Sequence, residues 1–356
     1  MEKIKKLAPG VLLCLVIALA ATLIVKYAPG MNVVGAPILG IIFGMIVGSG
    51  FKLGTGEPYK TGVGFTSKKI LQTAVILLGF GLDLATVGKV GAQSLPVIVS
   101  TVSTSLIVAF IVCRIAKVPS NSATLIGVGS SICGGSAIAA AAPVIKASDE
   151  EIAQSISVVF LFNVIAAILY PTLGGWLGMS DMGFGLFAGT AINDTSSVTA
   201  AASTWDTIHG TGSTVLDYAT IVKLTRVLCI IPICIGLSVI QAKKEAKSES
   251  GNGEKIKLSI KKMIPTFLIL FVAASTVTTV LNAVLTGGAL SGAGTVFGFL
   301  KKVSKFFIAM AMSAVGINTD VVKLIKTGGK PILLGFCCWV MIGIVSIIMQ
   351  HVIGIF

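Results

Sequence analysis

Long apolar runs divide the chain, and they limit its fold more than any other feature. Each run holds about 18 to 26 residues, the length that crosses a bilayer core of roughly 30 Å as a helix. With 54% hydrophobic residues, 12% charged residues and a mean hydropathy of +0.98, the chain has more apolar surface than one soluble core can bury. No segment alternates strictly in polarity as a membrane β-barrel strand does. We therefore predict an all-α, polytopic protein of the bacterial inner membrane.

The runs predict about eleven transmembrane helices within a single domain, residues 1–356. Lys3, Lys5 and Lys6 precede the first run and predict a cytoplasmic N-terminus by the positive-inside rule. We favour an uncleaved first helix over a signal peptide because many spans follow it. The expected spans are residues 10–27, 33–51, 69–88, 95–115, 121–146, 152–177, 183–204, 214–240, 263–286, 303–320 and 331–354.

The charges between the runs support this topology. Most of the basic segments between the runs fall on the predicted cytoplasmic side. The longest of them is predicted to be a flexible cytoplasmic loop at residues 241–262. The acidic break at residues 148–151 falls on the predicted outside. Lys301, Lys302 and Lys305 are exceptions to the positive-inside rule, because these basic residues also fall on the predicted outside.

Several classes of function are excluded by what the sequence lacks. The net charge of +13 lies in short breaks and not on a basic face with exposed aromatics, so we expect no nucleic-acid partner. The seven cysteines show no metal-ligand spacing and are interpreted as apolar filler. His209 and His351 belong to no HExxH motif, and there is no Walker loop or nucleophile elbow. We expect no catalytic residues, metal or cofactor.

An internal repeat is visible at the ends of two pairs of runs. Residues 81–96 align with residues 316–331 at a constant offset of 235, and each copy joins two apolar spans. The copies would have opposite orientations in the membrane, as in the inverted repeats of secondary transporters. Chance similarity between glycine-rich helix ends is the alternative. Asp83 in the first copy, aligned with Asn318, is expected near a helix end.

Two segments place small polar residues in the middle of a span and then continue as Ala-rich helices. They are GVGSSICGGSAIAAAAPVIK at residues 127–146 and GTAINDTSSVTAAAS at residues 189–203. Glycine weakens a helix, and Ser or Thr can bond freed backbone groups, so each segment predicts a discontinuous helix whose second half begins near mid-membrane. Such N-terminal ends favour anions. Close packing of small residues is the alternative. The candidate substrate-binding residues here are Ser130, Ser131, Gly134, Gly135, Ser136, Thr195, Ser196 and Ser197.

Charged residues inside predicted spans are a sharper signal, because each costs at least about 2.5 to 3.5 kcal/mol at a helix centre on insertion scales. Lys223 and Arg226 are three residues apart and so share a helix face, with Asp217 earlier in the span. We interpret the two cations as substrate-binding or ion-pairing groups, against the alternative that they snorkel to the headgroups. Asp194 is the candidate partner. It either pairs with them, carries a coupling proton, or holds Na⁺ together with Asn193.

At these motifs the chain resembles the YeiH-like family of bacterial inner-membrane proteins described as sulfate exporters. The resemblance runs through most of the chain and is carried by both small-residue segments, by ATIVKLTRVL at residues 219–228 and by AVGINTD at residues 314–320. It implies a carrier independent of ATP that moves sulfate or an organic sulfonate outward. It also implies a distant relation to antiporter and bile-acid-symporter folds with two crossed discontinuous helices. In those folds the two discontinuous helices occupy corresponding places in two long repeats. Here the two segments lie only about 60 residues apart, whereas the repeat has an offset of 235, which is a departure from that pattern.

The leading hypothesis is a secondary transporter, and not an enzyme, for a small oxyanion that is held by the half-helix N-termini and neutralised by Lys223 and Arg226. Coupling to H⁺ or Na⁺ would use Asp194. The alternative is a cation/proton antiporter with Asp194 as the ion site, and a third class is a non-transporting scaffold or sensor. We expect the protein to lie in the lipid bilayer, and a homo-oligomer is left open.

Overall fold

The computed structural model describes all residues except 1, 28–34, 248–265, 286 and 320–328, and its regular structure there is helical. The N-terminal part comprises α1 (Glu2–Tyr27), α2 (Ala36–Met45) with a π-helical end at Ile46–Gly50, α3 (Lys60–Phe65), a π-helical segment at Thr66–Ile70, α4 (Leu71–Gly79) and α5 (Leu84–Ala116). The middle comprises α6 (Ser120–Ser131), α7 (Gly135–Ala141), α8 (Asp149–Trp176), α9 (Asp181–Ala191), α10 (Thr195–His209), α11 (Thr214–Val227) and α12 (Ile230–Lys247). The C-terminal part comprises α14 (Thr266–Val284), α15 (Gly287–Asn318) and α17 (Gly329–Ile353).

The all-helical membrane fold is confirmed. Six of the described helical stretches are long and apolar enough to cross a bilayer, and each predicted span overlaps a helical segment. The boundaries differ most at residues 69–88, where the helix runs earlier and ends at Gly79. A new helix starts after Asp83, whose carboxylate accepts the Thr86 N–H at 2.8 Å and so caps α5, as expected of a residue near a helix end.

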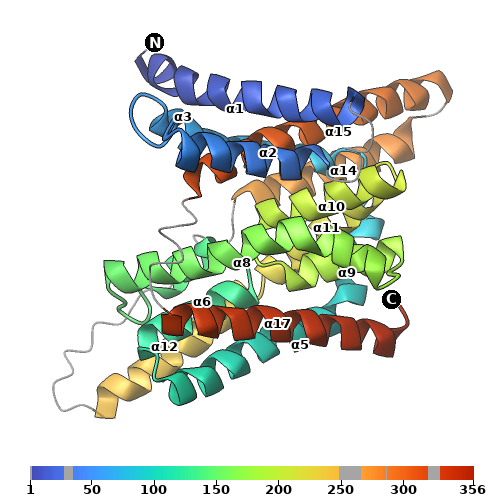
Figure 1. Cartoon of the computed structure of the whole chain (residues 1–356). Helices are drawn as coiled ribbons and strands as arrows, with labels where there is room; N and C mark the ends of the chain where they lie inside the picture. Colours follow the sequence, from blue (N-terminus) through green and yellow to red (C-terminus); the bar gives the residue numbers. More distant parts are fainter. Residues whose placement is uncertain (1, 28–34, 248–265, 286, 320–328) are drawn as a thin grey trace.

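The helices form a stacked bundle (Figure 1). In this view α1, α2 and α15 lie at the top, α17, α5 and α12 lie at the bottom, and α8 to α11 lie between them. The two termini lie at opposite ends of the bundle. The helices α2 and α15 approach closely because small residues face each other: a Cβ built on Gly44 would lie 3.0 Å from the Gly316 Cα.

The two predicted breaks are present, but each broken segment turns back on itself. The first, hairpin A, comprises α6 and α7 and breaks at residues 132–134. Asn121, at the start of α6, donates to the Glu151 carboxylate at the start of α8 at 3.2 Å. Because both ends of hairpin A therefore lie at one end of the bundle, α6 and α7 do not cross it.

The second broken segment, hairpin B, comprises α9 and α10 and breaks at residues 192–194. Trp205, near the end of α10, donates from Nε1 to the Asp181 carboxylate at the start of α9 at 2.8 Å. Hairpin B thus also enters and leaves at one end. Since α8 runs the length of the bundle between the two hairpins, they enter from opposite ends and meet near its middle.

Hairpin A corrects the predicted position of the acidic break. Residues 148–151 lie at the same end as the start of α6 and Lys117, not at the opposite one, because the chain returns before α8 begins. Glu151 caps this helix start by accepting the Ser148 N–H at 2.9 Å. The predicted loop 241–262 begins later than expected, since α12 extends to Lys247. The rest of that loop lies outside the described residues.

The proposed repeat is only partly covered by the structure. Residues 320–328 of its second copy lie outside the described residues. The flanking helices pack as pairs, α4 against α15 and α5 against α17. Asn318 ends α15, so it lies at a helix end like its aligned partner Asp83. The duplication stays a prediction.

Candidate site at the hairpin tips

Lys223 and Arg226 lie on one face of α11, and both are completely buried. Their polar atoms bond inside the bundle, so the snorkelling alternative is wrong. The place where they bond is the junction between the tips of hairpins A and B.

Arg226 uses every N–H of its guanidinium on the two hairpins. Its donors reach five oxygens. On hairpin A, Nε donates to the Ser131 carbonyl at 2.7 Å and one terminal nitrogen donates to the Ser130 carbonyl at 2.7 Å. On hairpin B, that same nitrogen donates to Asn193 Oδ1 at 3.2 Å, and the other terminal nitrogen donates to the carbonyls of Thr190 at 2.6 Å and Ile192 at 3.2 Å. A guanidinium has five N–H donors and no more. The group is therefore fully satisfied by the protein itself.

Lys223 bridges the same two tips. Its Nζ donates to the Ile132 carbonyl of hairpin A and, at 3.1 Å, to the Ile192 carbonyl of hairpin B. These carbonyls belong to the last turns or exits of α6 and α9, where a helix leaves its final C=O groups without intrahelical partners. A helix C-terminus also carries partial negative charge. The two cations thus cap and neutralise two buried helix C-termini, a role that the sequence analysis did not assign to them.

The N-terminus of α10 carries a carboxylate cap. Asp194 Oδ2 accepts the Ser196 backbone N–H at 2.9 Å and also the Ser196 hydroxyl. Asn163 on α8 accepts the N–H groups of Asn193 and Asp194 at 3.0 and 3.2 Å. Both donors of Ser196, which the prediction reserved for an anion, are therefore used within the protein. The Asn193 side-chain nitrogen is buried, and no partner for it is found in the described part of the chain.

Gly134 forms the turn at the tip of hairpin A. Its φ of +66° is a conformation that side chains disfavour, and a Cβ there would lie 3.5 Å from the Asn163 amide nitrogen and 3.8 Å from the Asp194 Cβ. Glycine at this position thus lets hairpin A turn sharply beside hairpin B.

A cavity of about 490 Å³ lies beside the tips. Of the predicted site residues, Gly135, Ser136, Asp194 and Thr195 line it. The cavity reaches the exposed Lys68 and is lined by Ser67, Lys68, Leu71, Gln72, Val75, Cys133, Gly135, Ser136, Ala139, Ile156, Phe160, Asn163, Asp194, Thr195, Val227 and Phe267. Its volume suits a small solute.

The other predicted residues lie behind this lining. Ser130 and Ser131 contribute their carbonyls to Arg226, and the Ser131 hydroxyl bonds the Val128 carbonyl at 2.9 Å. Ser196 and Ser197 are buried in the first turn of α10. Lys223, Arg226 and Asn193 likewise form the layer beneath the cavity and not its wall.

The sequence analysis missed the wall supplied by Ser67, Lys68 and Gln72, which lie just before or within α4. These residues lie at the boundary of a hydrophilic, basic segment, and nothing in their sequence distinguishes them from other polar residues near the membrane interface. Asn163 did carry a signal, as an amide in the middle of an apolar run. It both bonds a neighbouring segment and lines the cavity.

Asp217 does not pair with the Lys223 and Arg226 face. Its Oδ2 forms an ion pair with Lys301 Nζ at 2.6 Å, and Lys305 donates to the Gly212 carbonyl before α11. Lys301 and Lys305, two of the three lysines that were exceptions to the predicted charge distribution, thus have partners at or just before the start of α11. The pairing explains why lysines are tolerated there.

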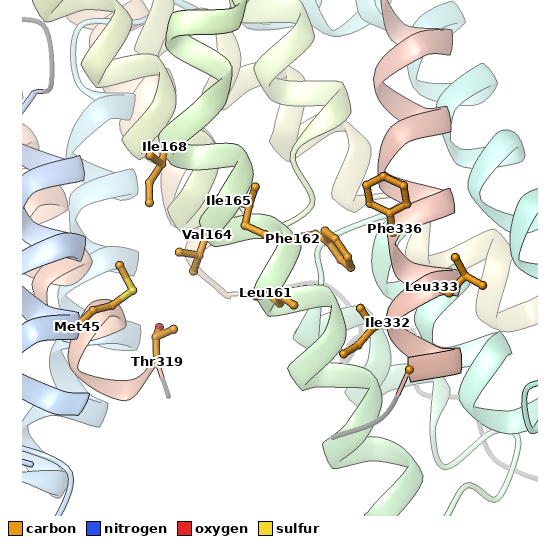
Figure 2. A pocket seen from close by; sticks show the side chains of 11 residues that line it. Met45, Leu161, Phe162, Val164, Ile165, Ile168, Thr319, Ile332, Leu333 and Phe336 are labelled. Atoms are coloured by element: carbon orange, nitrogen blue, oxygen red, sulfur yellow. The ribbon is translucent and has the colours of Figure 1, made fainter. Parts of the chain in front are cut away.

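A larger cavity of about 630 Å³ lies between α2, α8 and α17, and its wall is almost entirely apolar (Figure 2). Met45 and Thr319 face it from one side, Leu333 and Phe336 come from α17, and Ile168 marks the α8 side. No charged side chain lines it among the described residues. An ionic solute would be poorly solvated there, so the smaller cavity is the candidate site.

Comparison with known proteins identifies the family. The family model described as "Conserved hypothetical protein 698" matches residues 9–335. The UPF0324 membrane protein FN0533 of Fusobacterium nucleatum is 57% identical over 82% of this chain and 84% of its own length. The UPF0324 membrane protein SAG1125 of Streptococcus agalactiae is 53% identical over 98% of both chains, and one of Streptococcus mutans is 56% identical over 82% of both. No solved structure matches significantly.

The chain therefore belongs to the UPF0324 family of membrane proteins, which is the YeiH-like family that the motifs indicated. With its long apolar helices, it is a multi-pass membrane protein.

Proposed function

We propose that the protein is a secondary transporter of a small oxyanion in the bacterial inner membrane, with its N-terminus in the cytoplasm. One observation carries the proposal: two re-entrant hairpins from opposite ends of the bundle meet at a partly polar cavity above the buried Lys223 and Arg226. A site near the midplane, built from broken helices, suits alternating exposure to the two sides of a membrane.

The charges around the cavity favour an anion. Lys223 and Arg226 carry two positive charges beneath it, whereas Asp194 is the one acidic residue in its lining within the described part of the chain. Arg226 would act through its electric field, because all five of its N–H groups already bond the hairpins. Lys223 already donates two of its three N–H groups to hairpin carbonyls. Direct contacts would come from Ser136 and Thr195, whose side chains supply hydroxyl donors. Sulfate and organic sulfonates are the first substrates to test, with export as the proposed direction.

Asp194 is the proposed site of the coupling ion. It lines the cavity, so an ionised carboxylate there would repel an entering oxyanion. A proton or Na⁺ bound at Asp194 would remove that repulsion. Anion binding and cation binding should therefore favour each other by the same factor, since linkage is reciprocal.

The test is thermal stabilisation of the detergent-purified protein by sulfate, thiosulfate, sulfite, taurine, sulfoacetate, small carboxylates, Na⁺ and Li⁺. We expect one oxyanion to raise Tm and the shift to disappear in Ser136→Ala. The control is Ser157→Ala, because Ser157 is on α8 and bonds its own helix at 2.8 Å. No shift with any anion, together with no anion flux into proteoliposomes, would reject the anion site.

A cation/proton antiporter is the second candidate, favoured by the presence of Asp194 in a cavity wall from which both buried cations are absent. It predicts that Na⁺ or Li⁺ alone raises Tm. Asp194→Asn should remove that shift, while anions have no effect in either protein. Since Asn caps helices as well as Asp does, this variant should still fold.

A further inference from the structure

A third cavity lies away from the hairpin tips, in a groove between α5, α6 and α12. It has a volume of about 590 Å³ and is lined by Leu106, Ala109, Phe110, Cys113, Arg114, Ser120, Ala123, Thr124, Gly127, Val128, Ile233, Gly236, Leu237 and Ile240. Among the residues that the structure describes, Arg114 is the one charged residue in this lining, and the rest of the wall is mostly apolar. None of these residues lines the cavity at the hairpin tips.

The groove has the length of part of a lipid chain. Its lining on α5 extends from Leu106 to Arg114, and on α6 from Ser120 to Val128. Eight residues of helix span about 12 Å, and one leaflet of the hydrocarbon core is about 15 Å thick. The polar end lies at the α5–α6 connection, and the apolar part extends from there toward the middle of the bundle.

Arg114 is held at the mouth of the groove. Its guanidinium carbon lies 4.2 Å from the centroid of the Phe110 ring, a cation–π contact one helical turn earlier. The side chain is exposed, and no acidic group pairs with it in the part of the chain that the structure describes. Its planar donors are therefore available to a phosphate, which arginine binds in a bidentate manner.

We propose that this groove binds one anionic phospholipid, with the phosphate on Arg114 and an acyl chain between α5, α6 and α12. An apolar groove that ends in a cation with no acidic partner among the described residues complements an amphipathic anion. The occupant would lie against α6, the first arm of hairpin A. The proposal is independent of what the hairpin tips transport.

Two glycines define the shape of the groove. A Cβ on Gly127 would lie 2.6 Å from the Ala109 Cβ, so this glycine is needed for α6 to pack on α5. A Cβ on Gly236 would meet nothing within 4 Å, although Gly236 lines the groove. The Cβ of a leucine at position 236 would therefore meet no neighbouring atom, and the side chain would compete with the acyl chain for the groove.

The test is native mass spectrometry of the full chain in detergent with phosphatidylglycerol or phosphatidylcholine added. We expect the unaltered protein to retain one phosphatidylglycerol. Occupancy should fall at least tenfold in Arg114→Gln and in Gly236→Leu, and Arg114→Lys should retain part of it. The controls are Lys60→Gln, at an exposed lysine on α3, and Gly298→Leu, at an open glycine on α15. Both should bind like the unaltered protein.

Three results would overturn the proposal. Equal phosphatidylglycerol occupancy in Arg114→Gln and the unaltered protein would show that Arg114 does not bind the headgroup. Equal occupancy in Gly236→Leu and the unaltered protein would show that the acyl chain does not lie in the groove. Retention of phosphatidylcholine as strongly as phosphatidylglycerol would also reject an anion-specific site. Thermal unfolding of each variant without lipid verifies the fold, which we expect to be unchanged because Arg114 is exposed and Gly236 faces open space.

Discussion

Arg226 donates from Nε to the carbonyl oxygen of Ser131 at 2.7 Å, and this bond joins α11 to the C-terminal end of α6 in hairpin A. Four further bonds join the same guanidinium to both hairpin tips. A group with this many partners organises the site before any substrate arrives. Its loss should therefore affect the fold and not only the binding of a solute.

We predict that Arg226→Met lowers the stability of the purified protein by at least about 2 kcal/mol, because several buried carbonyls lose their donors. Arg226→Lys should recover only part of the loss, since an ammonium has three donors and a different shape. Thermal unfolding in detergent measures both. The chain's other arginine supplies the control: Arg114→Gln should leave Tm unchanged in lipid-free detergent. An Arg226→Met protein with normal Tm and lost anion binding would instead support a direct ligand role.

The sequence predicted the helices and the two breaks for a clear physical reason. Apolar length and mid-span glycine, serine and threonine are local properties, and they are visible without knowledge of the fold. The burial of Lys223 and Arg226 followed from the cost of isolated charges in lipid. Their partners did not follow, because helix carbonyls occur at every residue and leave no mark in the sequence.

The return of each hairpin was not predictable from apolar length. Residues 121–146 are long enough for one span, yet α6 covers only 12 residues, or about 18 Å, before it breaks. A continued span and a returning hairpin have the same composition. The distinction depends on a tertiary contact, such as that of Asn121 with Glu151, which no local pattern encodes.

The hairpin geometry predicts that positions 121 and 151 lie on the same side of the membrane. Single cysteines at Asn121 and Glu151, in a chain whose seven native cysteines are replaced, should both react with an impermeant maleimide from one side only. A cysteine at Asp181 should react from the opposite side, where hairpin B begins. Labelling of 121 and 151 from opposite sides would mean that residues 121–146 cross the membrane.

The ion pair between Lys301 and Asp217 should contribute to stability, because both side chains are largely buried, with exposed fractions of 23% and 12%. Lys301→Met leaves the Asp217 carboxylate without this partner, and we expect a loss of more than about 1 kcal/mol. The double variant Lys301→Met with Asp217→Leu should regain part of it. Lys302→Met, at the exposed neighbouring lysine, should have no effect. Equal Tm values for all four proteins would show that the pair contributes nothing.

The contact between α2 and α15 should tolerate no side chain at Gly44. A Cβ there would lie 2.9 Å from the Ile317 nitrogen and 3.0 Å from the Gly316 Cα, and backbone atoms of a packed helix cannot move aside cheaply. We therefore predict that Gly44→Val destabilises the protein by about 3 kcal/mol or more, at the upper end of overpacking effects.

The matched control for Gly44→Val is Gly50→Val, because Gly50 follows on the same helical segment and a Cβ there meets nothing within 4 Å. The measurement is thermal unfolding together with size-exclusion chromatography in detergent. Gly44→Val should elute as aggregate or unfold at a clearly lower temperature, whereas Gly50→Val should behave like the unaltered protein. If both variants retain the normal Tm, α2 and α15 do not pack as closely as the small residues at their interface indicate.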